Sequence, residues 1–183
     1  MGCLAGPVVV CAVSFKNAFY KKSDSNLKGL KESKLLSVTQ REKFVKRLLK
    51  EENLLYAISV RSPKKIDEIN IYQASREAMR TAVQKVASSR SGEVMVLVDG
   101  NKKIPNLKFD QQAIVKGDQK IFTIACASII AKVYRDKLMK RYATRFPVYG
   151  FEQHKGYSTK IHQDALNKVG PCAIHRRSFR LSY

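Results

Sequence analysis

The sequence predicts an α/β protein with a single domain over residues 1–183. Short β-branched, apolar runs alternate along the chain with segments whose apolar residues recur at helical spacing, an order typical of α/β folds. The chain has 183 residues and is 44% hydrophobic, which is enough for one globular core. No internal repeat, low-complexity tract or linker divides the sequence.

The first third of the chain predicts two strands and one helix. The run GPVVVCAVSF is β-branched and begins at Gly6-Pro7, which favours a strand. The helix has two candidate N-caps, Ser37 and Thr39, and Glu42 stands three residues after Thr39 as in a capping box. The expected elements are a strand at 6–15, a polar loop at 17–34, a helix at 37–53 and a strand at 54–62.

The rest of the chain continues this alternation. Asp-Gly ends an apolar run at Asp99, which predicts a buried strand followed by a turn, and Gly170-Pro171 stops the last helix. The expected elements are a short helix after Pro63, a longer helix through Val86, a strand at 93–100, a short strand within 108–118, helices at 120–146 and 158–170, and a basic loop at 174–183.

The net charge indicates a polyanionic partner. Lys and Arg number 35 against 15 Asp and Glu, giving a formal charge of +20. Such a surplus repels itself unless a polyanion is near, which points to nucleic acid or to an anionic membrane. The basic residues are spread over the whole chain, and no apolar run reaches transmembrane length, so nucleic acid is the favoured partner and no membrane is expected.

Cysteine usage and the opening segment both favour the cytoplasm. Four cysteines stand far apart, and the three histidines are not at zinc spacing, so we expect reduced thiols in or near the core. No positive charge precedes the opening apolar run, as a signal peptide requires. Gly6 stands where N-myristoylation needs Ser or Thr.

Two aspartates are candidate metal ligands. Asp99 ends an apolar strand, and ligand sites of open α/β sheets lie beyond the carboxyl ends of strands. The competing interpretation is a turn aspartate that binds nearby backbone. Asp118 stands just ahead of the long helix, where it is either a ligand or an N-cap. Asp136, between two basic residues, predicts a solvated salt-bridging role.

A third segment, residues 149–179, interleaves small, aromatic and basic residues. Tyr149, Phe151 and Tyr157 could stack on a sugar or base, while nearby Lys and Arg side chains could meet phosphates. The competing interpretation is ordinary core aromatics beside a basic surface.

Together these segments resemble bacterial ribonuclease HII over nearly the whole chain and in the family's order. The matching strings are LAGPVV (4–9), SKLLS (33–37), INIYQASREAM (69–79), LVDGN (97–101), VKGD (115–118), IACASIIAKVYRD (124–136), YGFEQHKGYSTKIHQDAL (149–166) and GPCAIHRRSF (170–179). The resemblance implies an RNase H-like fold, in which helices flank a central mixed sheet.

The resemblance also implies the reaction. Such enzymes cleave the RNA strand of RNA–DNA hybrids and cut 5′ of single ribonucleotides embedded in duplex DNA, leaving a 3′-hydroxyl and a 5′-phosphate. Two Mn²⁺ or Mg²⁺ ions would align water, lower its pKa and stabilise the leaving oxygen. The expected partner is therefore an RNA–DNA hybrid or ribonucleotide-containing duplex DNA, bound by a monomer.

Site residues carry over only where the family strings match. Asp99 and Asp118 correspond to two metal-binding, catalytic carboxylates, which favours the ligand interpretation for both. Tyr157 corresponds to a tyrosine that packs on the sugar at the RNA–DNA junction. The remaining candidates for contacts with nucleic acid are Gly2, Ser33, Lys34, Lys116, Lys155 and Arg176.

The chain departs from the family pattern at its start. Family members begin with a strand ending in Asp-Glu-Ala-Gly-Arg-Gly, whereas here Met1 stands at the Arg position and no Asp-Glu pair precedes it. We therefore expect the first, central strand of the sheet and two of four metal ligands to be missing. Either the natural protein is longer, which we favour, or this chain is an inactive, truncated hybrid-binding protein. The in-frame codons upstream of Met1 distinguish the two. Composition alone would also fit a general nucleic-acid-binding protein.

Overall fold

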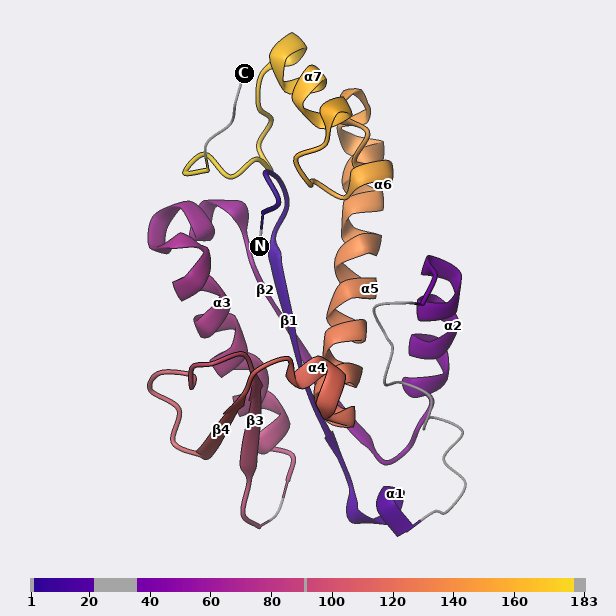
Figure 1. Cartoon of the computed structure of the whole chain (residues 1–183), viewed down its shortest axis with the longest axis vertical. Helices are drawn as coiled ribbons and strands as arrows, with labels where there is room; N and C mark the ends of the chain where they lie inside the picture. The colour runs from indigo at the N-terminus through magenta and orange to yellow at the C-terminus, as the bar shows by residue number, and fades with distance from the viewer. Residues whose placement is uncertain (1, 22–35, 91, 180–183) are drawn as a thin grey trace. The chain divides into compact units, whose positions relative to one another are not determined.

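The computed structural model describes residues 2–21, 36–90 and 92–179, in which strands and helices alternate (Figure 1). The α/β class is therefore confirmed. In chain order the elements are β1 (Val8–Phe15), α1 (Asn17–Lys21), α2 (Val38–Leu48), β2 (Leu54–Arg61), α3 (Pro63–Ala87), β3 (Met95–Asp99), β4 (Asp110–Ile114), α4 (Gly117–Lys120), α5 (Phe122–Arg145), the 3-10 helix η2 (Pro147–Tyr149), α6 (Phe151–His154) and α7 (Lys160–Val169).

The chain forms two compact units. The first comprises Met1–Val9, Val60–Ser75 and Tyr134–Tyr183, and the second comprises Val10–Ser59 and Arg76–Val133. The boundary between them falls inside β1, β2, α3 and α5, so each of these elements contributes residues to both units.

The strands pair differently from the single central sheet that we expected. Among the described residues, β1 pairs with β2 and β3 pairs with β4, giving two separate two-stranded sheets (Figure 1). The β3–β4 pair is parallel, and Asp99 lies opposite Ile114. A continuous sheet needs a strand that is hydrogen-bonded on both edges, and each described strand has one partner strand only.

The second unit has two apolar clusters. The larger cluster buries Phe15 on β1, Leu48 on α2 and Ile129 and Ile130 on α5. The smaller cluster joins Val96 and Val98 of β3 to Ile104. Helix α2 begins with a full capping box, in which Ser37 accepts from the Gln40 amide and Gln40 accepts from the Ser37 amide. Of the two predicted N-caps, the structure therefore selects Ser37.

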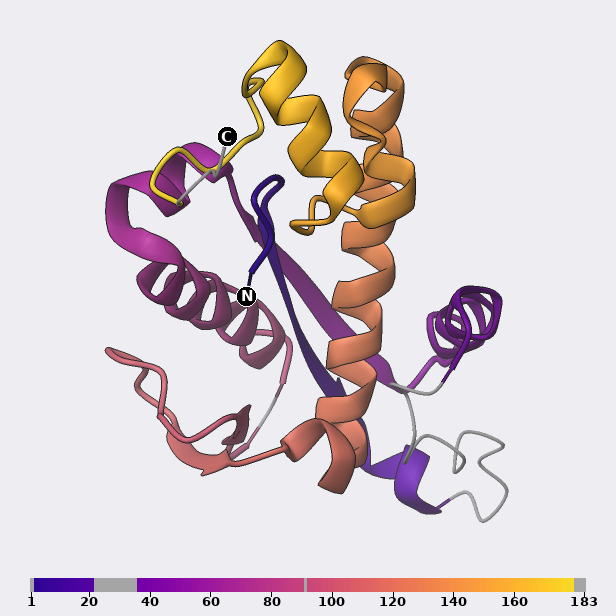
Figure 2. The same cartoon turned by 45° about the horizontal axis from the view of Figure 1, so that its top comes forward.

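The first unit packs around the C-terminal half of α5. Figures 1 and 2 both show α6 and α7 beside this half of the helix. Met139 on α5, Phe151 on α6 and Leu166 on α7 are almost completely buried together. The two helices predicted after Pro63 are also present: Asn70, at φ 63°, kinks α3, and its side chain caps the second part by accepting from the Gln73 amide.

Two short helices replace predicted loops. Helix α1 lies at the start of the expected polar loop, whose remaining residues 22–34 lie outside the described residues. Helix α4 separates β4 from α5. In the part of the chain that the structure describes, no helix combines the length and apolar character needed to cross a membrane.

Candidate functional site

The carboxyl ends of β3 and β4 bring the predicted metal-binding segment together in the second unit. In the parallel register, Asp99 and Ile114 end their strands side by side, and the Gly100 amide donates to the Ile114 carbonyl at 2.9 Å. The chain then turns so that the Gly117 amide donates to Asp99 Oδ1 at 2.9 Å. The carboxylate of Asp99 is thus fixed against the residue that precedes Asp118.

This close approach explains the glycine in VKGD. A Cβ atom on Gly117 would lie 2.7 Å from Ile124 Cδ1 and 3.4 Å from Asp99 Oδ1. Lys116 adopts a left-handed conformation, at φ 55°, which turns the chain from β4 into α4. The Lys116 side chain is exposed beside the turn. Both residues therefore shape the turn that carries Asp118.

Asp118 is not the N-cap that the competing interpretation expected. It lies in the first turn of α4, and the N-cap position belongs to Lys116, which makes no side-chain cap. Asp118 is buried, with only 6% of the residue exposed. The segment thus places two carboxylates near one sheet edge, and carboxylate oxygens are the ligands that Mg²⁺ and Mn²⁺ prefer.

Two carboxylates alone would be only a partial ligand set. Within residues 2–21, 36–90 and 92–179, no group of three or more His, Cys, Asp or Glu side chains is arranged to hold a metal ion. The chemistry of Asp99 and Asp118 fits a hard divalent ion, and a complete cage needs further oxygen ligands.

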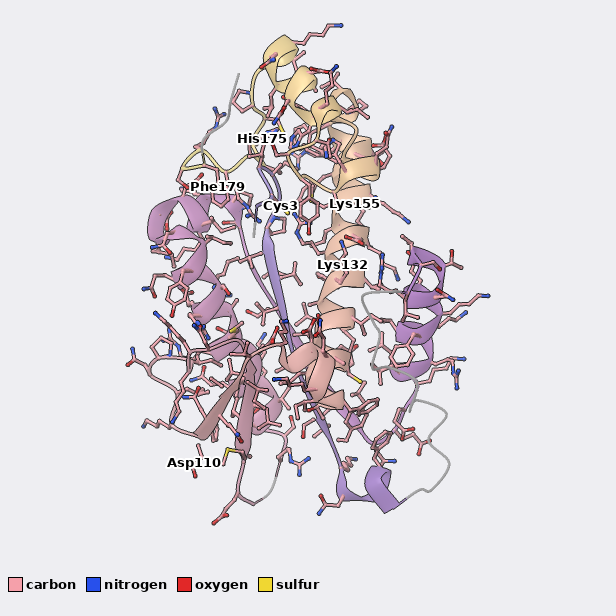
Figure 3. The ribbon with its side chains drawn as sticks, viewed as in Figure 1. Cys3, Asp110, Lys132, Lys155, His175 and Phe179 are labelled. Atoms are coloured by element: carbon pink, nitrogen blue, oxygen red, sulfur yellow. The ribbon has the colours of Figure 1, made fainter. Side chains whose placement is uncertain are left out.

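In the first unit, the N-terminal segment lies between two turns that are distant in sequence. The Leu4 amide donates to the Gly156 carbonyl and the Gly6 amide to the Ile174 carbonyl, each at 2.8 Å. A Cβ atom on Gly156 would lie 2.5 Å from the Ala5 carbonyl oxygen, so only glycine fits there. Cys3, Lys155 and His175 mark these three segments in Figure 3.

Arg135 of α5 binds this assembly through backbone carbonyls. Its guanidinium donates to Ala5 at 3.1 Å, to Pro7 at 3.2 Å and to Lys155 at 3.0 Å. The guanidinium carbon also lies 5.9 Å from the centroid of the Tyr157 ring, within range of a cation–π contact. Arg135 therefore positions the segments around Tyr157.

Tyr157 is the exposed member of this assembly. The residue is 45% exposed, whereas its neighbour Cys3 is 6% exposed. Partial burial raises the pKa of the Tyr157 hydroxyl, with the nearby Cys3 thiol raising it further and Arg135 lowering it. Asp136 also raises this pKa. Asp136 is itself buried, so its predicted role as a solvated salt-bridge residue is wrong, because that face of α5 turns inward.

Arg176 differs from the surface cation that its sequence context suggests. It is 3% exposed, and its Nε donates to the Gly6 carbonyl at 3.0 Å. Burial lowers the pKa of its guanidinium to about 10, and the neighbouring Arg135 lowers it as well. The geometry gives Arg176 the role of supporting the Gly6-Pro7 turn.

The other predicted contact residues fall into three groups. Gly2 is exposed at the start of the N-terminal segment. Lys155 has a left-handed backbone and donates through Nζ to the Glu152 carbonyl. Ser33 and Lys34 lie outside the described residues.

Sequence reasoning missed two features of the first unit. It treated Arg135 as one of the two basic residues beside Asp136, whereas the side chain donates to three backbone carbonyls. It also examined the histidines only for zinc spacing, whereas His154, His162 and His175 are all buried and their rings contact one another. The strings HKGYST and IHRRSF contain two of these histidines beside the site, which was the available signal.

Comparison with known proteins shows the family to which this chain is similar. The family model described as Ribonuclease HII matches residues 1–182. Ribonuclease HII of Caldicellulosiruptor bescii is 44% identical over 178 residues, which cover 97% of this chain and 81% of that protein. The ribonuclease H2 structure from Pyrococcus horikoshii OT3 matches with a TM-score of 0.77 at 25% identity, covering 98% of this chain and 90% of that one. Bst-RNase HIII in complex with Mn²⁺ shares the fold, with a TM-score of 0.79 at 14% identity over 99% of this chain and 64% of that one.

The fold and these similarities define a hydrolase of the ribonuclease H class. Within that class, the chain belongs to the Ribonuclease HII family, because the family match spans nearly all of it. The family predicted from the sequence strings is thereby confirmed.

Proposed function

We propose that this protein hydrolyses the RNA strand of RNA–DNA hybrids and cuts 5′ of single ribonucleotides in duplex DNA, leaving a 3′-hydroxyl and a 5′-phosphate. The observation that carries the proposal is the hydrogen bond from the Gly117 amide to Asp99, which fixes one carboxylate beside the turn that presents Asp118. Family membership supports the same reaction. The net charge of +20 suits a polyanionic substrate.

In this proposal, Asp99 and Asp118 hold divalent Mn²⁺ or Mg²⁺. The bound ions supply a more acidic water molecule and stabilise charge on the leaving oxygen. The residues of this chain fix the orientation of the carboxylates: the Gly117 amide holds Asp99, and the first turn of α4 holds Asp118. The neighbouring Lys116 is positioned to meet a phosphate.

The first unit provides the proposed contacts with the nucleic acid. Tyr157 offers an exposed ring for packing against a sugar, and a 2′-hydroxyl at that point separates RNA from DNA. Gly2 and Lys155 remain proposed backbone contacts of this unit. Ser33 and Lys34, which lie outside the described residues, are proposed backbone contacts from another part of the chain. For Arg176, the buried guanidinium supports an indirect role, through the carbonyl of Gly6.

The proposal is tested by nicking of a labelled duplex that carries one ribonucleotide, in the presence of Mn²⁺. Outer-shell partners of a metal site are worth about 10–100-fold, so losing a direct ligand is expected to cost more than ~100-fold in nicking. We expect this loss for Asp99→Asn in a chain extended at its N-terminus by a strand with the family's Asp-Glu pair. Binding of the duplex should be almost unchanged, because Asn keeps the shape of the Asp side chain.

Asp110→Asn is the matched control. Asp110 begins β4, where it pairs with Met95. It therefore lies at the far end of the β3–β4 pair from Asp99 and is labelled in Figure 3. In the same extended chain, this variant should nick at the rate of the protein without a substitution. Nicking by Asp99→Asn at that same rate would contradict the ligand assignment.

A second experiment addresses the ligand count. We propose that full activity needs a central strand ending in the family's Asp-Glu-Ala-Gly-Arg-Gly pattern, which would add two carboxylates to Asp99 and Asp118. Nicking should therefore be much faster for a chain extended by that strand than for the 183-residue chain. Equal rates would contradict the four-carboxylate cage. Binding without nicking by both chains would favour the hybrid-binding alternative.

We also propose that residues 1–183 act as one catalytic domain and that the protein works as a cytoplasmic monomer on nucleic acid, without a membrane partner. Sedimentation of the purified chain, alone and with the duplex, tests the monomer: a single species of 20.7 kDa is expected for the free protein.

A further inference from the structure

All three histidines of the chain lie in one buried cluster of the first unit. His162 is 0%, His175 2% and His154 8% exposed. The rings of His154 and His162 stack at 4.4 Å between centroids, and those of His162 and His175 lie 5.2 Å apart. None of them has a part in the metal chemistry proposed above, and the cluster lies directly behind the turn that presents Tyr157.

Backbone groups at both ends of the His162–His175 pair determine where each proton lies. The Cys172 amide donates to His175 Nδ1 at 2.9 Å. A backbone amide can only donate, so His175 Nδ1 accepts and the neutral ring carries its proton on Nε2. That Nε2 lies 3.0 Å from His162 Nε2, which must therefore accept.

The proton of His162 is then on Nδ1, where its acceptor is Tyr157. His162 Nδ1 lies 2.9 Å from the Tyr157 carbonyl oxygen, which can only accept. Donation therefore runs in one direction, from the Cys172 amide through His175 and His162 to the Tyr157 carbonyl. We call these three hydrogen bonds the histidine relay.

His154 is fixed in the same way. The Gly156 amide donates to His154 Nδ1 at 3.2 Å, and His154 Nε2 lies 2.6 Å from the Tyr149 carbonyl. The ring is therefore a neutral Nε2–H tautomer that ties Gly156 to Tyr149 at the end of η2. Both residues of the Gly156-Tyr157 turn thus depend on a neutral histidine.

If either ring of the relay took up a second proton, two hydrogen-bond donors would face each other and their hydrogen bond would be lost. Protonated His175 would turn an Nδ1–H toward the Cys172 amide, and protonated His162 would turn an Nε2–H toward His175. The titratable groups around the pair are His154, Tyr149, Cys172 and Arg177, whereas Tyr157 contacts the pair through its backbone carbonyl. Burial lowers the pKa of His162, and burial with the neighbouring His162 lowers the pKa of His175 to about 4.

We infer that His162 and His175 are positioning residues for Tyr157: the neutral histidine relay holds the Tyr157 backbone, and protonation of the relay releases the turn and weakens substrate binding. The second clause rests on the proposed function, in which Tyr157 contacts the substrate. Movement of this turn would also break the hydrogen bond from the Leu4 amide to the Gly156 carbonyl, which is 2.8 Å long.

The tautomers can be measured without any nucleic acid. Long-range ¹H–¹⁵N NMR spectra of the histidine-labelled 183-residue chain at about pH 7 should show Nδ1–H for His162 and Nε2–H for His175 and His154. The amide of Tyr157 should exchange faster once the relay is protonated. A His162 ring that is charged, or protonated on Nε2, at this pH overturns the relay.

Two substitutions at His162 separate positioning from general stability. His162→Asn places an amide N–H near the former Nδ1 and keeps the donor to Tyr157, but it gives up the link to His175. His162→Gln reaches the former Nε2 and keeps the link to His175, but it loses the donor to Tyr157. Neither side chain titrates. Asn167→Ala is the control, since Asn167 is exposed on the same helix, α7.

The readout is the dissociation constant for a duplex carrying one ribonucleotide at about pH 7, where the relay is neutral, and at about pH 4, where His175 takes up a proton. His162→Asn should bind like the control at the higher pH, whereas His162→Gln should bind about tenfold more weakly, as expected for one lost interaction. Lowering the pH should weaken binding of the duplex more in the unaltered chain and in the control than in His162→Asn. Equal affinities of the Asn and Gln variants overturn the positioning role.

The two proposals fail in different ways. If the unaltered chain shows no preference for the ribonucleotide, the proposed function fails, and the NMR tautomers still judge the relay. If it prefers the ribonucleotide but His162 has the other tautomer, the relay fails and the proposed function stands.

Discussion

At the scale of single residues, backbone amides and carbonyls decide the chemical state of side chains in the first unit. His175 is neutral because the Cys172 amide faces one ring nitrogen and His162 the other. Arg176 is held by a backbone carbonyl too, through its hydrogen bond to Gly6. Such buried groups stabilise the fold only in the protonation state that their partners require.

Acid should therefore destabilise the protein through His175. The unfolded chain takes up this proton near pH 6.5, whereas the folded chain takes it up near pH 4. As the pH falls from 6.5 to 4, protons bind preferentially to the unfolded state, so the free energy of unfolding falls, by on the order of 3 kcal/mol for this group, and it levels off below pH 4.

Urea unfolding at a series of pH values measures this effect. His175→Asn retains an oxygen that can accept from the Cys172 amide, and it cannot be protonated in this range. Its stability should be lower at neutral pH, because the hydrogen bond to His162 is gone, but it should change less with pH than that of the unaltered chain. Parallel curves for the two proteins would contradict the assignment.

At the scale of elements, the ends of helices and strands carry most of the specific structure. The end of β4 turns through left-handed Lys116 into α4, and this turn brings the Gly117 amide to Asp99. The kink at Asn70 divides α3, and the capping box at Ser37 starts α2. In each case a short polar side chain accepts from a backbone amide at the start of a helical segment, where the helix leaves amides unpaired.

The capping box gives a direct test at this scale. Ser37→Ala removes the acceptor for the Gln40 amide and should lower the free energy of unfolding by about 1 kcal/mol. Thr39→Ala is the matched control, because Thr39 lies inside α2 and is exposed, so its loss should cost less than about 0.5 kcal/mol. A larger effect at Thr39 than at Ser37 would show that α2 starts later in solution.

At the scale of the whole molecule, charge dominates. A net charge of +20 on 183 residues implies that bound phosphates release many counterions. If six or more phosphates are contacted, raising salt from about 50 to about 200 mM should weaken binding of a hybrid duplex by roughly a thousandfold. Fluorescence anisotropy across this range measures the slope. A nearly flat salt dependence would mean that the basic residues lie away from the nucleic acid.

The sequence by itself determined the class, the family and the order of the strands and the longer helices. Apolar periodicity depends only on neighbouring residues, so the strand at 54–62 and the long helix before Phe146 were predicted almost to their ends. Asp99 and Tyr157 were also proposed as site residues from the sequence, because each stands within a string that resembles the family.

Only the tertiary structure decided what the buried polar side chains do. Asp136 and Arg176 have ordinary charged neighbours in sequence, yet both are buried, because their surroundings come from segments far along the chain. The relay likewise joins His162 to His175 across thirteen positions and then returns to Tyr157. Hydrogen bonds of this kind depend on distances of about 3 Å between atoms, which local sequence patterns do not encode.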